Sequence, residues 1–158
     1  MKVASYSVLL ALFCAVRLGG DCSFCSIKTM ESGSPIIVKQ PIESLSDLLK
    51  AVEYYKNWRI FVLYFGTPQS DGQSWCPDCR EAKPTIDEAL KYLPYNGVFL
   101  TVYVGDRATW KDPQNEFRTY PKCSVQSIPT IDQWEPHNRV SGDNILHIIN
   151  IQNLFADK

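Results

Sequence analysis

Residues 75–79, with the sequence Trp-Cys-Pro-Asp-Cys, limit the possible folds of this chain more than any other stretch. Two cysteines separated by two residues either close a small disulfide ring or supply half of a metal site. An apolar run over residues 60–65 comes before them, and a helical pattern begins at Cys76. Unpaired N–H groups and the helix dipole favour an anion at a helix N-terminus, and a thiolate is an anion. The pattern therefore predicts a strand, a redox-active dithiol and then a helix.

The rest of the chain shows alternating strand and helix patterns. Strands are expected over residues 36–38, 59–65, 98–104 and 130–134, with an edge strand near Val140. Helices are expected over residues 41–56 (capped by Ser44), 76–93, part of 109–120, and after a cap at Asp143 or Asn144. Four residues form the expected inner face of the last helix: Ile145, Ile148, Ile149 and Leu154. This order predicts an α/β fold with a central sheet covered by helices on both faces.

Composition narrows the possible functions. The 158 residues suffice for one domain with a core. Sixteen basic and seventeen acidic residues give a net charge of −1, which implies no basic face for nucleic acid or an anionic membrane.

The N-terminus differs from the rest of the chain. Lys2, an apolar stretch and Arg17 are typical of a secretory signal over residues 1–20, which is too short to span a bilayer. Residues 21–35 are expected to be a cysteine-containing lead-in, and 36–158 the folded domain. Removing Cys14 with the signal leaves five cysteines, so at least one thiol stays free or forms an intermolecular bridge. The sequence therefore predicts a secreted protein with no membrane segment in its mature form.

Two stretches resemble one family in particular. The first is residues 66–79, in which an insertion precedes the Trp-Cys-Pro-Asp-Cys segment. The second combines Val-Gly-Asp at 104–106 with Trp-Lys-Asp-Pro-Gln-Asn-Glu-Phe-Arg at 110–118. Together with Ile-Pro-Thr at 128–130, they are similar to the thioredoxin-like superfamily, and specifically to the thioredoxin domain-containing protein 17 type. The resemblance covers residues 36–158 and implies a thioredoxin fold with a mixed sheet.

The residues and the resemblance together predict a protein-disulfide reductase. Cys76 is expected to attack a small or exposed disulfide, and Cys79 to resolve the mixed disulfide, with no cofactor beyond this dithiol. Asp78 is a candidate for proton handling at Cys79, or alternatively a solvent-exposed charge in the first turn of the helix. Four residues are expected to contact the substrate, and the resemblance implies a cis bond before the last of them: Trp75, Pro77, Ile128 and Pro129.

Partners and location follow from the same reading. The predicted partners are disulfide-containing small molecules or proteins and an electron donor of the thioredoxin reductase type, and the chain is expected to be a monomer. The resemblance implies the cytosol, in conflict with the secretion signal.

Two alternatives stay open. Cys22 and Cys25 could join Cys76 and Cys79 in a four-cysteine zinc site, although fifty residues separate the pairs. The chain could also be a secreted binding module that has lost catalysis. His137 and His147 are expected at the surface or on a helix, which argues against a Cys-His hydrolase.

Overall fold

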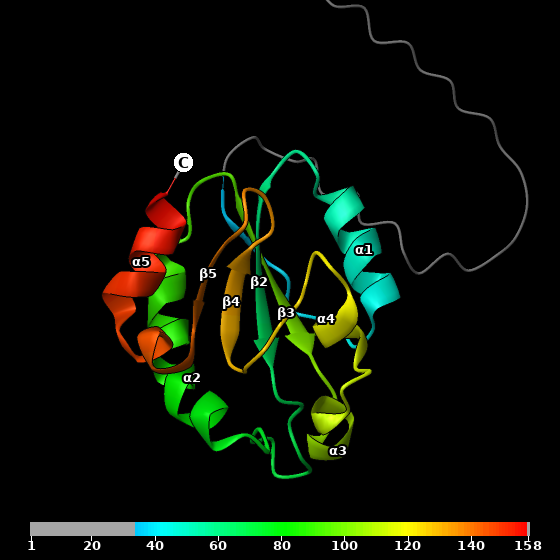
Figure 1. Ribbon diagram of the computed structural model, residues 1–158. Coiled ribbons are helices and arrows are strands. Elements are labelled where there is room, and N and C mark those ends of the chain that lie inside the picture. Colours follow the sequence, from blue (N-terminus) through cyan, green and yellow to red (C-terminus); the bar gives the residue numbers. More distant parts are fainter. Residues whose placement is uncertain (1–33, 158) are drawn as a thin grey trace, which may run out of the picture. The chain divides into compact units, whose positions relative to one another are not determined.

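The computed structural model describes residues 34–157 (Figure 1). The strands are β1 (Ile36–Ile37), β2 (Arg59–Phe65), β3 (Gly97–Tyr103), β4 (Thr130–Gln133) and β5 (Asn138–Ser141). The α-helices are α1 (Leu45–Tyr54), α2 (Pro77–Ala89), α3 (Arg107–Lys111), α4 (Glu116–Thr119) and α5 (Ile148–Ala156). Two 3-10 helices, η1 (Leu90–Tyr92) and η2 (Gly142–Leu146), complete the order. The alternation of strands and helices predicted from the sequence is confirmed.

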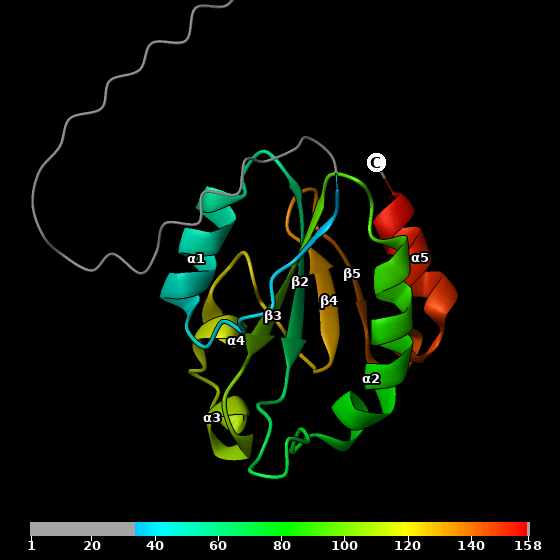
Figure 2. The same ribbon diagram turned by 180° about the vertical axis from the view of Figure 1, so that it is seen from behind.

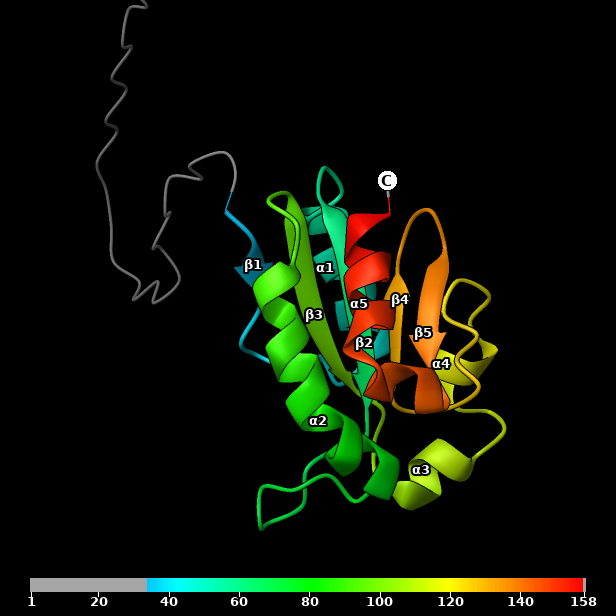
Figure 3. The ribbon, with the colours of Figure 1, turned by 90° about the vertical axis from the view of Figure 1, so that its left-hand side faces the viewer.

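The strands form one mixed sheet in the order β1-β3-β2-β4-β5. Strands β1, β2 and β3 are parallel, whereas β4 runs antiparallel to both β2 and β5. Helices α2 and α5 cover one face, and α1, α3 and α4 cover the other, as Figures 1 and 2 show from opposite sides. Figure 3, which looks onto one face of the sheet, shows α2 and α5 alongside each other in front of the strands. The predicted α/β thioredoxin fold is thus confirmed.

Strand β2 is buried on both faces because it lies at the centre of this sheet. On one face, the Phe61 ring packs edge-on against Phe155 of α5 at 4.8 Å between centroids. On the other face, Tyr64 packs against Phe117 of α4 at 5.9 Å. A strand covered twice needs apolar side chains at successive positions, which explains the unbroken apolar run in the sequence.

Helix α1 begins later than residue 41. Ser44 is its N-cap, as predicted, and its hydroxyl accepts a hydrogen bond from the Asp47 amide. Before the cap, Ile42 forms a parallel bridge with Val102, so this residue extends the sheet edge instead of the helix. Leu48 of α1 is fully buried and faces the core.

The prediction for the last helix was wrong in two respects. Neither Asp143 nor Asn144 caps α5, because Gly142, with φ of +57°, starts the separate helix η2 and α5 begins only after His147. Of the predicted inner face, Ile145 and Leu154 are buried, whereas Ile149 is 56% exposed. The residues of α5 that enter the core are Ile151, Leu154 and Phe155.

Candidate functional site

Cys76 is the N-cap residue of α2, and Pro77 occupies the first helical position. Proline suits that position because the missing N–H has no helical partner there. The Cys76 amide donates a hydrogen bond to Ser74 Oγ at 3.2 Å, and its Sγ lies 3.8 Å from the Ile128 carbonyl oxygen. Both cysteines are free in this structure. The predicted placement of a thiol at the start of a helix is therefore present.

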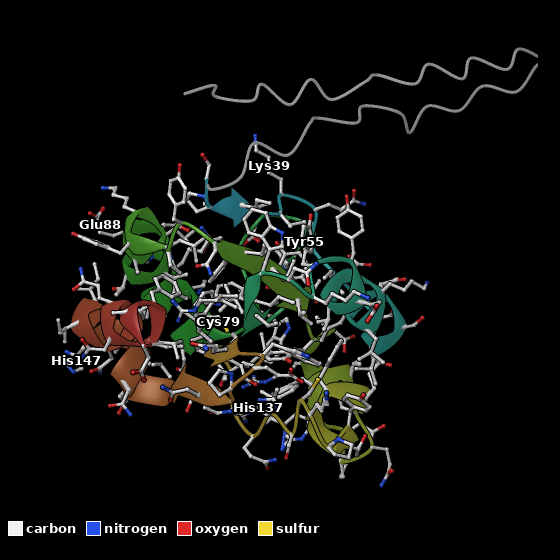
Figure 4. The ribbon with its side chains drawn as sticks, turned by 90° about the horizontal axis from the view of Figure 1, so that it is seen from above. Lys39, Tyr55, Cys79, Glu88, His137 and His147 are labelled. Atoms are coloured by element: carbon white, nitrogen blue, oxygen red, sulfur yellow. The ribbon has the colours of Figure 1, made fainter. Side chains whose placement is uncertain are left out.

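Cys79 lies one turn further along α2 and is fully buried (Figure 4). Burial raises the pKa of the Cys79 thiol, and a hydrogen bond to Cys76 raises this pKa as well. The Gly66 amide donates to Cys79 Sγ at 3.5 Å, which opposes part of the effect because the hydrogen bond favours a thiolate. The Cys79 thiol therefore holds its proton, and Cys76 is the sulfur that lies nearer the surface.

Gly66 belongs to the site although the sequence analysis gave it no role. Its carbonyl accepts a hydrogen bond from Ser74 Oγ at 2.7 Å, which brings the insertion back to the end of β2. A Cβ at this position would lie 2.6 Å from Ser74 Oγ and 3.1 Å from Cys76 Cβ. Only glycine fits this approach of backbone to site. A glycine directly after a buried strand was the available signal.

Of the four predicted substrate-contact residues, Ile128 lies nearest to the nucleophile, with its carbonyl oxygen 3.8 Å from Cys76 Sγ. Ile128 and Pro129 are buried, and the peptide bond between them is cis. Trp75 is half-buried, and its Nε1 donates to the Gly105 carbonyl at 2.8 Å. The Arg107 guanidinium lies 5.9 Å from the centroid of the Trp75 ring, so a cation sits beside the aromatic surface. Pro77 is exposed at the start of α2.

Asp78 is exposed, whereas the thiol it was predicted to serve is fully buried. No hydrogen bond joins the Asp78 side chain to another described residue. The proton-handling role stays a prediction that requires water between the two groups. Ser74 and Arg80 connect the site differently, since Arg80 Nη1 donates to the Ser74 carbonyl at 2.7 Å.

The two histidines lie away from the cysteine pair. His147 precedes α5 and is exposed at the outside of the molecule, as Figure 4 shows. His137 is half-exposed, and its Nδ1 lies 3.7 Å from Asp132 Oδ1. The predicted surface positions are confirmed.

A second polar cluster, which the sequence analysis missed, lies on the face of the sheet opposite α2. Asp132 is fully buried within β4 and pairs with Arg139 of β5 at 2.9 Å. Within residues 34–157, Tyr64 Oη and Asp132 Oδ1 have no hydrogen-bond partner. Burial also raises the pKa of the Cys123 thiol to about 11. An acidic residue inside a strand expected to be buried was the sequence signal for this cluster.

Residues 34–157 show neither a metal-binding cluster nor a membrane-spanning helix. No group of three or more Cys, His, Asp or Glu side chains there could hold a metal ion. Cys22 and Cys25 lie outside the described residues, as does the predicted signal, so the four-cysteine zinc alternative stays untested. None of the described helices has the length and apolar character needed to cross a bilayer.

Comparisons with known proteins agree with this geometry. The family described as "Thioredoxin domain-containing protein 17-like, thioredoxin domain" matches residues 40–157. Thioredoxin domain-containing protein 17 from Homo sapiens is 31% identical over 116 residues, covering 73% of this chain and 93% of that protein. The Mus musculus protein of the same name is 43% identical over 82 residues, covering 52% and 65%. Thioredoxin-like protein Clot from Arabidopsis thaliana is 33% identical over 95 residues, covering 60% and 71%.

Solved structures give a weaker comparison. The germline-specific thioredoxin Deadhead from Drosophila melanogaster has a TM-score of 0.48 and 17% identity, covering 74% of this chain and 96% of that one. This similarity is too low to carry an argument. The match over residues 40–157 spans well over half of the chain and supports a thiol–disulfide oxidoreductase in general. The chain belongs to the thioredoxin domain-containing protein 17 family.

Proposed function

We propose that this protein reduces small or exposed disulfides through Cys76 and Cys79. The observation that carries the proposal is the unequal setting of the two sulfurs. Cys76 begins α2 and faces the Ile128 carbonyl, whereas Cys79 is fully buried one turn later with a raised thiol pKa. In this proposal, Cys76 reacts with the substrate first, and Cys79 reacts only after the mixed disulfide has formed.

The reaction takes two steps. The Cys76 thiolate attacks one sulfur of the substrate, which breaks the substrate S–S bond, forms a mixed disulfide and releases the first thiolate to take up a proton. Cys79 then loses its proton and attacks Cys76 Sγ, which forms the Cys76–Cys79 disulfide and releases the second thiol. The substrate gains two electrons and two protons. An electron donor of the thioredoxin reductase type would return the dithiol to its reduced form, with no further cofactor, and the protein would act as a monomer.

Loss of the Cys79 proton is the unfavourable step, because burial destabilises the thiolate and raises the pKa of the Cys79 thiol. The Gly66 amide stabilises the charge as it forms. Asp78 is the proposed acceptor of the proton through water, since its exposed carboxylate lies on the residue before Cys79. The Asp78→Asn variant should slow resolution of the mixed disulfide without slowing the first attack. Equal rates of both steps in the variant and the native protein would remove Asp78 from the mechanism.

The insertion before the cysteines is the proposed basis of substrate selection. It forms a small hairpin, with a bridge between Pro68 and Ser74 and a hydrogen bond from the Gln69 amide to the Gln73 carbonyl of 2.8 Å. A hollow of about 490 Å³ separates this hairpin from α3 and is lined in part by Trp75 and Arg107. A hairpin that leads directly into Cys76 is proposed to favour a small disulfide over one embedded in a folded surface.

Single-cysteine variants test the reaction. The Cys79→Ser variant should accumulate a stable mixed disulfide with cystine or insulin, detected as an added mass on residue 76. The Cys76→Ser variant should lose reduction altogether. The Cys123→Ser variant is the matched control, because Cys123 is buried elsewhere and should leave turnover unchanged. Full turnover by the Cys76→Ser variant would overturn the proposal.

The two alternatives have direct tests. Stoichiometric zinc in purified full-length protein that survives dialysis would favour the four-cysteine site with Cys22 and Cys25. Absence of cystine and insulin reduction by the pre-reduced protein would favour a binding module without catalysis.

Location is a separate proposal, which concerns residues 1–20. Family membership favours the cytosolic alternative, and the predicted signal lies outside the described residues. The signal prediction is tested by expressing the full chain in eukaryotic cells and measuring the N-terminal residue of the product. Protein beginning near residue 21 in the medium would support secretion, and an intact N-terminus inside the cell would refute it.

A further inference from the structure

The guanidinium of Arg139 connects the sheet to the segment that faces the cysteine pair. Arg139 lies opposite Asp132 in the antiparallel pairing of β5 with β4. Its Nη2 donates to Asp132 Oδ2 at 2.9 Å, and this carboxylate is fully buried. A buried carboxylate needs a charged partner, so Asp132 fixes the position of the guanidinium.

The same guanidinium also reaches two consecutive backbone carbonyls. Arg139 Nη2 donates to the Cys123 carbonyl at 3.0 Å, and Nη1 donates to the Ser124 carbonyl at 3.3 Å. Ser124 has φ of +43°, in the left-handed region where residues other than glycine are uncommon. Such a conformation persists only where surrounding contacts impose it, and the fork of an arginine matches two adjacent acceptors well.

These carbonyls begin the segment 123–129, which ends at the site. The Thr130 hydroxyl donates to the Ser127 carbonyl at 2.7 Å, and the Val125 amide donates to the Phe117 carbonyl at 3.0 Å. The Ile128 carbonyl then lies 3.8 Å from Cys76 Sγ. The segment is therefore held at its start by Arg139, in the middle by the backbone, and at its end by Thr130.

We propose that Arg139 is a positioning residue for the substrate disulfide. It touches neither sulfur, but it holds the segment that brings the Ile128 carbonyl to Cys76 Sγ and ends at Pro129. Losing this hold should misplace the groups that an extended substrate would meet, and leave the dithiol unchanged. The proposal deepens the reductase function above and rests on it for its kinetic consequence. The hold on segment 123–129 can be tested without any activity.

The first test uses the Arg139→Met variant of the full chain. Single-turnover reduction of insulin by pre-reduced protein should need on the order of ten times more insulin for half the limiting rate. The limiting rate should change by less than about threefold, since loss of uniform binding raises KM and spares the chemical step. Alkylation of Cys76 by iodoacetamide should stay within about twofold, because a small reagent does not need the segment.

Two matched variants separate positioning from folding. Removing Arg139 alone leaves Asp132 buried and unpaired, so the Asp132→Leu/Arg139→Met double variant replaces the ion pair by apolar groups and keeps the fold. It should show the same insulin defect as Arg139→Met. Lys122→Met is the control, because Lys122 lies in the adjoining turn and forms only an exposed pair with Glu135. It should behave like the native protein.

Amide hydrogen exchange gives a readout independent of catalysis. The amides of Cys123, Ser124 and Val125 should exchange at least about tenfold faster in the double variant, with the core of β2 unchanged. Native insulin kinetics and unchanged exchange in the double variant would overturn the role of Arg139. If exchange is faster in the double variant but the native protein reduces no disulfide, the reductase function is rejected. The role of Arg139 in holding segment 123–129 would then still stand.

Discussion

Single atoms decide the geometry around Cys76. Gly66 contributes to this geometry in three ways. Its amide donates to Cys79 Sγ, its carbonyl accepts a hydrogen bond from Ser74 Oγ, and the position has no room for a side chain. None of these contributions uses an ionisable group of Gly66 itself. The chemistry of the cysteine pair therefore depends on a residue with no reactive atom of its own.

The Gly66→Ala variant is expected to be less stable and slower. Its Cβ would meet Ser74 Oγ at 2.6 Å, so the hydroxyl or the backbone must move. Overpacking of this kind costs about 1–3 kcal/mol, measurable by urea denaturation. Mixed-disulfide resolution should slow because the amide leaves Cys79. Gly72→Asn is the control, since nothing lies within 4 Å of a Cβ there and asparagine tolerates a φ of +77°. Equal effects of both variants would contradict this explanation.

Helix caps and the insertion hairpin act at the scale of whole elements. Ser44 is the N-cap of α1. The Leu45 amide at the next position donates to Glu116 Oε1 at 2.7 Å, which links α1 to α4. The hairpin over residues 66–74 is held by its own backbone contacts and by Gly66. The first feature links two helices of the domain, and the second is the proposed basis of substrate selection.

The Ser44→Ala variant should lower the free energy of unfolding by about 1 kcal/mol, because the Asp47 amide loses its capping partner. Chemical denaturation measures the change. Ser46→Ala is the matched control within the same turn, and it should be neutral because that side chain is exposed and makes no capping bond. An equal loss in both variants would show that the cap is not the cause.

Replacing residues 69–73 by two glycines should broaden substrate choice. Without the hairpin, the rate of insulin reduction should rise severalfold relative to the rate of cystine reduction, and the cystine rate itself should change little. The ratio of the two rates in single-turnover experiments is the measurement. An unchanged ratio would assign substrate selection to another part of the surface.

The sequence predicted local features better than it predicted interruptions. The apolar run of β2 and the Ser44 cap depend on neighbouring residues alone, and both are confirmed. The start of α5 depends on how the chain leaves β5, so Gly142 and η2 moved it beyond the predicted caps. The Arg139–Asp132 pair joins two strands whose register no local pattern encodes.

At the scale of the whole molecule, the two faces of the sheet have different roles. The α2 face holds the cysteine pair, and the opposite face holds the buried cluster of Tyr64, Cys123 and Asp132. Burial raises the pKa of both Tyr64 and Cys123, so each group keeps its proton in the folded state at a pH where the unfolded chain has lost it. The fold must therefore weaken in alkali.

Stability should fall as the pH rises from about 9 to about 11. Below 9.0, the ordinary value for cysteine, Cys123 is protonated in both states, and above it only the unfolded state ionises until the folded pKa of about 11 is reached. The interval corresponds to a loss of about 2–3 kcal/mol. Urea denaturation across this range should show a shallower decline for Cys123→Ala than for the native protein. Parallel declines would mean that other groups account for the loss.

The burial of Cys79 has a consequence for covalent inhibition. Of the three cysteines in residues 34–157, Cys79 and Cys123 are 0% exposed and Cys76 is 5% exposed, so Cys76 is the one that a soft electrophile is expected to reach. In the proposed mechanism, its sulfur is also the route by which electrons leave Cys79. A single adduct on Cys76 would therefore prevent the Cys79 thiol from taking part in disulfide reduction. A covalent inhibitor of this protein would need only one electrophilic group. The amount of inhibitor bound per mole of protein would then report the fraction of molecules with a reactive Cys76.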